Sequence, residues 1–214
     1  MRLDHVSYAA PVGHLADTVQ RIGAALGATF TDGGLHPRFG TRNFILPLAG
    51  GTYIEVVAAL EHPAAYTAPF GQAVRARADQ GGGWLSWVVS VSNMAAVETR
   101  LGRKAVSGHR VRPDGYDLCW QQIGVLDTMT DAQLPFFVHW LSDNDEHPSA
   151  GGSDVRIAQL DIAGSPDRVC TWLGEPAHHP LDEVNVTWLD ENDPSGPGLA
   201  AVTLLTPRGV VRVD

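Results

Sequence analysis

Hydrophobic and polar positions along the chain form a pattern that occurs three times. Each copy begins with a strand-like run, continues with a short amphipathic helix, and ends with three further strand-like runs. The helices are predicted from apolar residues at helical spacing, as between Met94 and Leu101 in the second copy. A glycine follows each helix, at Gly27, Gly102 and Gly174, where the left-handed conformation that ends helices favours this residue.

The three copies divide the chain into predicted modules. The first βαβββ module covers 1–62, the second covers 84–148, and a third βαβββ-like module covers 154–214. A connector covers 63–83 and is expected to hold a short helix through Phe70, Val74 and Ala78. A period near 60 residues with this content is not that of a solenoid. The pattern therefore indicates an α+β fold built from a duplicated, partly triplicated module.

Composition and charge exclude several classes of function. The chain is 44% hydrophobic and 18% charged, which is typical of a globular protein. Its net charge of -9 and the lack of a basic cluster argue against nucleic-acid binding. The start of the chain lacks the apolar core of a signal peptide, and no apolar run approaches the roughly 18 residues of a membrane span. We therefore expect a cytoplasmic protein with two free cysteine thiols.

Overlaying the first two modules suggests a metal site. The overlay places Glu55, in the strand "GTYIEVVA", opposite His139, and places His5 opposite Ser86. If the modules curl into one trough, the two-residue period of strands points His5, Glu55 and His139 into it. Two imidazoles and a carboxylate with open positions are typical of a catalytic divalent metal, here Zn, Fe, Mn or Ni. Alternatively, Glu55 pairs with His5 as a proton-carrying partner, or with an arginine at the trough edge.

The sequence also resembles a known superfamily. The "LDH" start, the duplication, and the stretches "GGLHPRFGTRNFILPL", "TYIEVVA" and "LPFFVHW" resemble the glyoxalase-like domain group of the vicinal oxygen chelate superfamily over positions 1–148. The resemblance implies paired βαβββ units curled into a mixed-sheet trough, with metal ligands on the first and last strand of each unit. By position these ligands are His5, Glu55, Ser86 and His139. Ser86 departs from the expected His or Gln, which leaves at most three protein ligands.

Further candidates for the site are polar residues near the second strand of the first module and side chains suited to a pocket wall. His36 is a candidate general base and Glu55 a second catalytic candidate, although His36 in its loop would also serve to hold the turn before Pro37. Asn43 would either contact the substrate or cap this turn. The remaining substrate-binding candidates are arginines that could clamp a carboxylate and aromatic residues that could line the trough: Arg42, Arg110, Arg112, Tyr53, Trp84, Trp120 and Phe137.

Two functions fit these features. The first is a metal-dependent enzyme of lyase, isomerase or dioxygenase type that acts on a small oxygen-bearing metabolite. The second is a metal-free protein of bleomycin-resistance type that binds or sequesters a small molecule, which the departure at Ser86 favours. The third module lacks a partner module within the chain. It would either pack outside the trough or pair across a two-fold axis, and of these we favour a homodimer.

Overall fold

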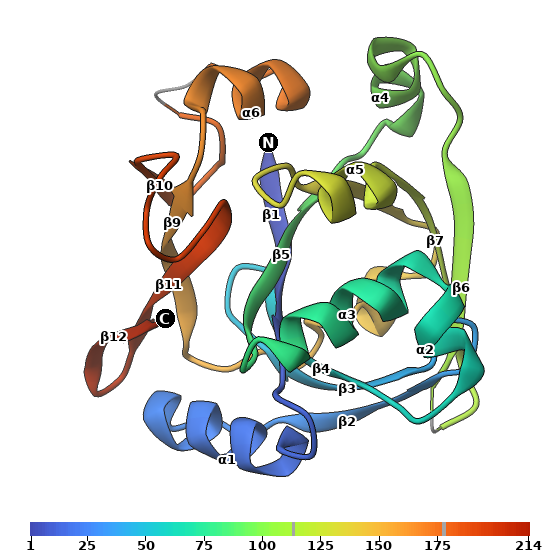
Figure 1. Ribbon diagram of the computed structural model, residues 1–214, viewed down its shortest axis with the longest axis vertical. Helices are drawn as coiled ribbons and strands as arrows, with labels where there is room; N and C mark the ends of the chain where they lie inside the picture. The colour runs from blue at the N-terminus through green and yellow to red at the C-terminus, as the bar shows by residue number, and fades with distance from the viewer. Residues whose placement is uncertain (113, 177–178) are drawn as a thin grey trace.

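The computed structural model describes residues 1–112, 114–176 and 179–214 and contains two β-sheets (Figure 1). The first sheet has eight strands in the order β2-β3-β4-β1-β5-β8-β7-β6, so its two halves repeat one strand order about the central β1–β5 pair. The last strand of each half runs parallel to the first, and β1 and β5 pair antiparallel. The predicted duplication into a curled mixed sheet is therefore confirmed.

The elements of this sheet follow the predicted pattern, with three additional short helices. The first half consists of β1 (Arg2–Ala9), α1 (Leu15–Leu26), β2 (Thr31–His36), β3 (Thr41–Pro47) and β4 (Tyr53–Ala59). The connector forms α2 (Pro63–Thr67) and the predicted helix α3 (Pro69–Asp79). The second half consists of β5 (Gly83–Ser90), α4 (Met94–Leu101), β6 (Val106–Val111), β7 (Asp117–Ile123), α5 (Val125–Thr130), β8 (Phe136–Trp140) and the 3-10 turn η1 (Asn144–Glu146).

The C-terminal part forms the second sheet. Its elements are β9 (Arg156–Ala163), α6 (Pro166–Leu173), β10 (Asn185–Leu189), β11 (Gly198–Thr206) and β12 (Gly209–Val213). Their order along the chain is that of a βαβββ module, as expected. The pairing differs, because β9 lies between β10 and β11 instead of beside the last strand of its own module. The third module is thus βαβββ-like in element order but not in topology.

The second sheet packs against the outer face of the first at its centre. In Figure 1, β9 and β11 lie alongside β1 and β5. Trp87 on β5 is fully buried in a core cluster shared with Leu160 on β9 and Val202 on β11. Helices α1 and α4 contribute to the same core through Ile22 and Val97. The third module therefore packs outside the trough, one of the two arrangements expected, while the homodimer stays a prediction.

The inner face of the first sheet is closed at one end by α3. Val74 of α3 forms a small buried cluster with Ala9 of β1 and Val57 of β4. A side chain at Gly71 would overlap the carbonyl of Phe39, so α3 lies directly against the turn between β2 and β3. Helices α2, α3 and α5 are seen in Figure 1 on the opposite side of β1 and β5 from the second sheet. The remaining inner face is left to line a cavity.

Two properties of the whole chain complete the fold. Cys119 and Cys170 are both free thiols, as predicted. None of the helices in the described ranges combines the length and the apolar character needed to cross a bilayer.

Candidate functional site

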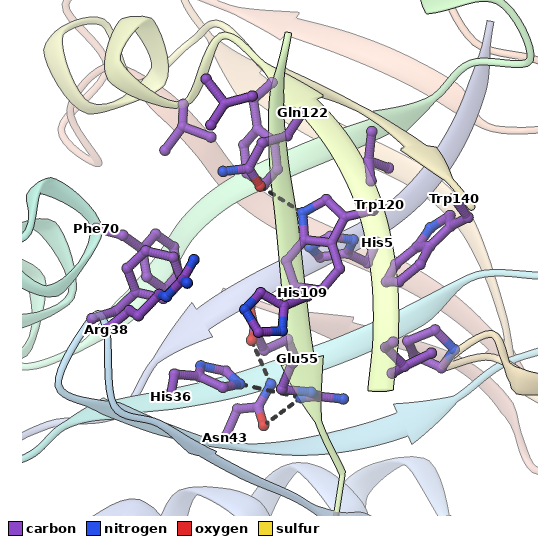
Figure 2. A pocket seen from close by; sticks show the side chains of 18 of the residues that line it. His5, His36, Arg38, Asn43, Glu55, Phe70, His109, Trp120, Gln122 and Trp140 are labelled. Atoms are coloured by element: carbon purple, nitrogen blue, oxygen red, sulfur yellow. Dashed lines mark hydrogen bonds between the residues drawn. The ribbon is translucent and has the colours of Figure 1, made fainter. Parts of the chain in front are cut away.

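A cavity of about 1040 Å³ occupies the inner face of the eight-stranded sheet (Figure 2). Both halves of the sheet line it, together with the turn after β2, α3 and the segment that begins α5. Its walls are mainly apolar, which is usual for small-molecule sites. The aromatic part of the wall consists of Phe39, Tyr53, Phe70, Trp120, Phe136 and Trp140.

A fully buried carboxylate, Asp4 on β1, underlies one side of the cavity. Its Oδ1 lies 2.7 Å from Nδ1 of His5, and its Oδ2 accepts a hydrogen bond of 2.9 Å from Nε1 of Trp140 and lies 3.3 Å from Nε2 of His147. Burial alone would raise the pKa of Asp4, but the hydrogen bonds and charge of the two histidines outweigh it and hold that pKa well below its usual range. Asp4 is therefore ionised and can only accept hydrogen bonds.

The hydrogen bonds around Asp4 fix the tautomers of both histidines. The backbone N–H of Ser149 donates to Nδ1 of His147 at 3.1 Å, so Nε2 is the ring nitrogen that carries a proton toward Asp4. His5 carries a proton on Nδ1 because this nitrogen faces Oδ1 of Asp4, which can only accept. In neutral His5, Nε2 carries the lone pair and has no hydrogen-bond partner in the described part of the chain. The ring lines the cavity between Tyr53, stacked at 4.4 Å, and Phe136, edge-on at 6.1 Å.

Glu55 on β4 is a second buried carboxylate at the cavity floor. Its two oxygens accept hydrogen bonds from Ser7 Oγ at 2.7 Å and from Asn43 Nδ2 at 2.6 Å. Burial would raise the pKa of Glu55, but the nearby rings of His5 and His36 and these two hydrogen bonds lower it overall. Glu55 is therefore an ionised group whose oxygens are already bound by neutral donors.

Arg110 on β6 connects the second half of the sheet to this carboxylate through Asn43. Its Nη1 donates to Asn43 Oδ1 at 3.2 Å and to His36 Nε2 at 3.2 Å. Burial is the main cause that lowers the pKa of His36 to about 4. The negative charge of Glu55 opposes this decrease, and the positive charge of Arg110 adds to it. His36 is thus neutral at pH 7, with Nδ1 bound to Thr41 Oγ1 at 3.1 Å and Nε2 accepting from Arg110.

The structure brings His5 and Glu55 to the cavity but not His139. Phe136, Val138 and Trp140 line the cavity, so the alternate residue His139 points to the other face of β8, where Nδ1 bonds the carbonyl of Val91 at 2.8 Å. The predicted set of three ligands is therefore not assembled.

The physical reason is the strand register. Ser7 of β1 lies beside Glu55 of β4, and the equivalent pair in the second half is Val88 beside Phe136. The counterpart of Glu55 is thus Phe136, three positions before His139, and an odd shift exchanges the two faces of a strand.

The donor set at this position does not fit a divalent metal. Among the residues that the structure describes, no three His, Cys, Asp or Glu side chains are grouped so as to hold an ion. Ser7 and Asn43 occupy both oxygens of Glu55. Ser86 has a buried hydroxyl without a hydrogen-bond partner, but a neutral hydroxyl does not replace an imidazole or a carboxylate as a ligand.

Comparison with known proteins identifies the family. The family profile described as "Glyoxalase-like domain" matches residues 3–177, which is most of the chain. The chain belongs to the glyoxalase-like domain family. This confirms the resemblance to the vicinal oxygen chelate superfamily that the sequence motifs indicate. A comparison with curated proteins finds no significant match.

Solved structures resemble this glyoxalase-like domain only distantly. Methylmalonyl-CoA epimerase from Mycobacterium tuberculosis is 15% identical, covering 65% of this chain and 86% of its own, with a TM-score of 0.42. A hypothetical protein from Bacillus halodurans C-125 is 14% identical, covering 66% and 94%, with a TM-score of 0.41. A variant of the Streptomyces coelicolor methylmalonyl-CoA epimerase in complex with 2-nitronate-propionyl-CoA is 15% identical, covering 65% and 96%, also with a TM-score of 0.41.

The substrate-binding candidates of this glyoxalase-like domain divide into two groups. Those that line the cavity are Arg42, Asn43, Tyr53, Arg110, Arg112 and Trp120. Trp84 and Phe137 lie in the core instead: Trp84 donates to the carbonyl of Val213 at 2.9 Å, and Phe137 packs against Trp172. Phe137 alternates with the cavity residues of β8, and β1 and β5 change register near Trp84, so sequence parity alone misplaced both residues.

Sequence reasoning missed several parts of the site. Asp4 had a signal, because it is a charged residue in an otherwise apolar strand and precedes His5 directly. His147 lies beyond the last strand of its module and reaches Asp4 only through the fold. Helix α5, which begins at the cavity, has no counterpart in the first module.

Proposed function

We propose that this glyoxalase-like domain is an enzyme that moves a proton at a carbon atom of a small organic molecule without a resident metal. The supporting observation is the 2.7 Å contact between Asp4 Oδ1 and His5 Nδ1, which leaves Nε2 of His5 as the basic atom on the cavity side. An ionised carboxylate that orients an imidazole is a recurrent arrangement for a general base. Of the reaction types expected, an isomerase removes a proton from carbon with this base and returns it to the carbon skeleton, whereas a lyase also expels a leaving group.

In this proposal each group has a defined role. Nε2 of His5 accepts the proton, and Asp4 stabilises the imidazolium that forms while keeping the ring in place. Tyr53 and Phe136 flank the ring, so an apolar carbon of the substrate, rather than bulk water, lies next to the base. Dioxygenase chemistry would need an iron centre, which the donor set around Glu55 does not supply.

Hydrogen–deuterium exchange tests the proposed function. Phenylpyruvate, its methyl ester and phenylacetone carry acidic C–H bonds and differ in charge, and their exchange in D₂O is followed by proton NMR. We expect the wild-type protein to accelerate exchange of at least one probe by roughly 10²-fold or more over His5→Gln, since general bases contribute at this level. His14→Gln is the matched control, because His14 forms a similar pair with Asp17, at 2.9 Å, on the exposed surface. Equal exchange by the wild type and His5→Gln for all three probes would refute the proposal.

A second candidate function is binding without chemistry. The size and the aromatic wall of the cavity favour it, since both would suit a protein that sequesters a flat organic molecule. The two functions separate in the same samples: saturable binding of a probe with no accelerated exchange supports sequestration, and accelerated exchange supports catalysis.

A further inference from the structure

The charge of the cavity lining is opposite to that of the whole chain. The chain carries a net charge of -9, yet six cationic side chains line the cavity against three acidic ones. Four of the cations are paired with carboxylates, namely Arg42, Arg103, Lys104 and Arg112. In the described part of the chain, Arg38 and Arg110 have no carboxylate within 4.0 Å. Arg38 is exposed at the rim, whereas Arg110 is partly buried.

The hydrogen bonds of Arg110 leave one complete edge of its guanidinium available. A guanidinium has five N–H donors. The two on Nη1 are used by Asn43 and His36. The donors on Nε and Nη2 have no hydrogen-bond partner among residues 1–112, 114–176 and 179–214. These two nitrogens form the side of the group that binds a carboxylate through two parallel hydrogen bonds.

Arg110 is also held rigidly by neutral groups. Asn43 is fixed by Glu55 at 2.6 Å, and His36 is fixed by Thr41 at 3.1 Å. Glu55 is thus linked to Arg110 through the side-chain amide of Asn43, and the carboxylate does not pair directly with the guanidinium. A guanidinium that is oriented before a ligand arrives loses less entropy on binding.

An aromatic side chain of the neighbouring strand β7 lies over β6, the strand that carries Arg110. A side chain at Gly108 would overlap the indole of Trp120, so this ring lies flat across β6 two residues from Arg110. Trp140 lies beside Trp120, with 5.5 Å between ring centroids (Figure 2). The charged edge of Arg110 and a wide apolar face are therefore adjacent within one cavity.

We propose that Arg110 is the anchor for a carboxylate and that the ligands of this cavity are organic acids with a flat, apolar body. The carboxylate binds Nε and Nη2 of Arg110, and the body lies against Trp120 and Trp140. This inference rests on the proposed function in that it names the substrate class of the same cavity. Glu55 and Asn43 are then positioning residues, because they act through Arg110.

Matched ligand pairs test the inference. Phenylacetate and the neutral phenylacetamide have the same shape, and their binding is measured by calorimetry and by quenching of tryptophan fluorescence. We expect the wild-type protein to bind phenylacetate about tenfold or more tightly than the amide, as for a charge-assisted pair. Arg110→Met abolishes this preference and Arg110→Lys reduces it, since a lysine lacks the planar fork. Lys104→Met, which removes an exposed lining cation paired with Glu98, retains the preference.

Several results would overturn the inference. These are equal affinity of the wild type for acid and amide, a preference that persists in Arg110→Met, or no saturation by any of phenylacetate, 2-naphthoate and phenylpyruvate. The acid-to-amide ratio of the wild type remains informative even if Arg110→Met fails to fold. Because the measurement is binding, a preference for acids without catalysed exchange would support this inference and refute the proposed enzyme. Catalysed exchange of only the neutral probes, the methyl ester and phenylacetone, would support the proposed enzyme and refute this inference.

Discussion

Asp4 and Glu55 are both buried carboxylates, but their partners give them different tasks. Asp4 receives hydrogen bonds from ring nitrogens and keeps the tautomer of His5 fixed. Glu55 receives them from a hydroxyl and an amide and keeps Asn43 in place for Arg110. The buried charge within the strand "GTYIEVVA" is therefore satisfied by neutral hydrogen-bond donors, which offset the cost of burying an anion.

Replacing Asp4 with Asn tests the first of these networks. We expect Asp4→Asn to lower the free energy of unfolding at pH 7 by about 2–4 kcal/mol, since it leaves buried donors without a charged acceptor. The pKa of Asp4 is lowered in the folded state, so its stabilisation is present above the ordinary carboxyl pKa and is lost as the pH falls through the folded value. Urea unfolding of both proteins between pH 7 and pH 3 should show the difference shrinking in acid.

The control for this prediction is Asp17→Asn, because Asp17 pairs with His14 at the surface. An exposed pair contributes little, so Asp17→Asn should change the free energy of unfolding by less than about 1 kcal/mol. A similar loss in both variants, or a loss in Asp4→Asn that is independent of pH, would contradict the role given to Asp4.

The contact between Arg110 and His36 makes a prediction about a pKa. The positive charge of Arg110 contributes to lowering the pKa of His36 to about 4, so Arg110→Met should raise it toward the ordinary value. NMR titration of the His36 ring measures this directly, with Lys104→Met as the control. Between the folded pKa of about 4 and the ordinary pKa of an imidazole, the unfolded chain binds a proton at His36 that the folded chain does not bind. The contribution of His36 to stability therefore falls as the pH falls through this interval, and the interval is narrower in Arg110→Met. An unchanged titration in Arg110→Met would contradict the contact.

At the scale of elements, hydrophobic periodicity predicted most strands and helices because each buries one face. Ser165 begins α6 by accepting from the N–H of Arg168, and Gly174 ends it with a φ of 74°, as their sequence positions indicate. Which side chains of a strand point into the cavity was less certain from the sequence, since this depends on the register between strands. An overlay that is wrong by an odd number of residues places a side chain on the wrong face of its strand, as for His139.

The wrong register has an identifiable cause. In the first half, positions 48–52 connect β3 to β4, whereas positions 124–135 connect β7 to β8 and contain α5. The overlay aligns the "EHP" stretches at 61–63 and 146–148 with one extra residue in the second module, but 6 residues separate Glu55 from Glu61 and 10 separate its counterpart Phe136 from Glu146. No pattern in the sequence marks a six-residue helix at this point, because Val125–Thr130 is too short for helical periodicity to be visible.

A single glycine in β2 tests how the elements shape the site. Gly33 lies at the irregular pairing between β2 and β3, and a Cβ there would overlap the side-chain oxygen of Asn43. We expect Gly33→Ala to weaken phenylacetate binding several-fold and to lower the free energy of unfolding by about 1–3 kcal/mol through overpacking. Calorimetry and urea unfolding measure the two effects.

Gly50→Ala provides the comparison for this variant. Gly50 has a φ of 79° and open space around it, so alanine costs backbone strain without touching the site. It should lose stability and keep its affinity for phenylacetate. Loss of affinity in both variants would show that general destabilisation, and not the position of Asn43, controls binding.

At the scale of the whole molecule, the second sheet supports the strands that carry the site. β1 bears Asp4, His5 and Ser7 on or near its inner side, while its outer side and that of β5 share a core with β9 and β11. The site residues of the first 112 positions thus depend on packing with the last 60 or so. Composition predicted a core of this size, but the topology of the third module was not visible in its element order.

Shortening a side chain in this shared core tests the dependence. Leu204 on β11 is fully buried, and Leu204→Ala should lower the free energy of unfolding by about 2–5 kcal/mol in one cooperative transition. Val210→Ala on β12, where Val210 is 69% exposed, should stay within about 0.5 kcal/mol of the wild type. Two separate transitions in Leu204→Ala would show that the second sheet unfolds independently of the trough.

The central claim is that Glu55 organises protein groups in the cavity and does not hold a metal. Calorimetric titration of the wild type and Glu55→Gln with Zn²⁺, Mn²⁺, Ni²⁺ and Fe²⁺, and with phenylacetate in the presence of a chelator, tests it most directly. We predict that no ion binds the wild type at a site that depends on Glu55, and that Glu55→Gln weakens phenylacetate binding because Asn43 no longer holds Arg110. Binding of one ion per chain that Glu55→Gln abolishes, with phenylacetate binding lost on addition of chelator, would contradict the account.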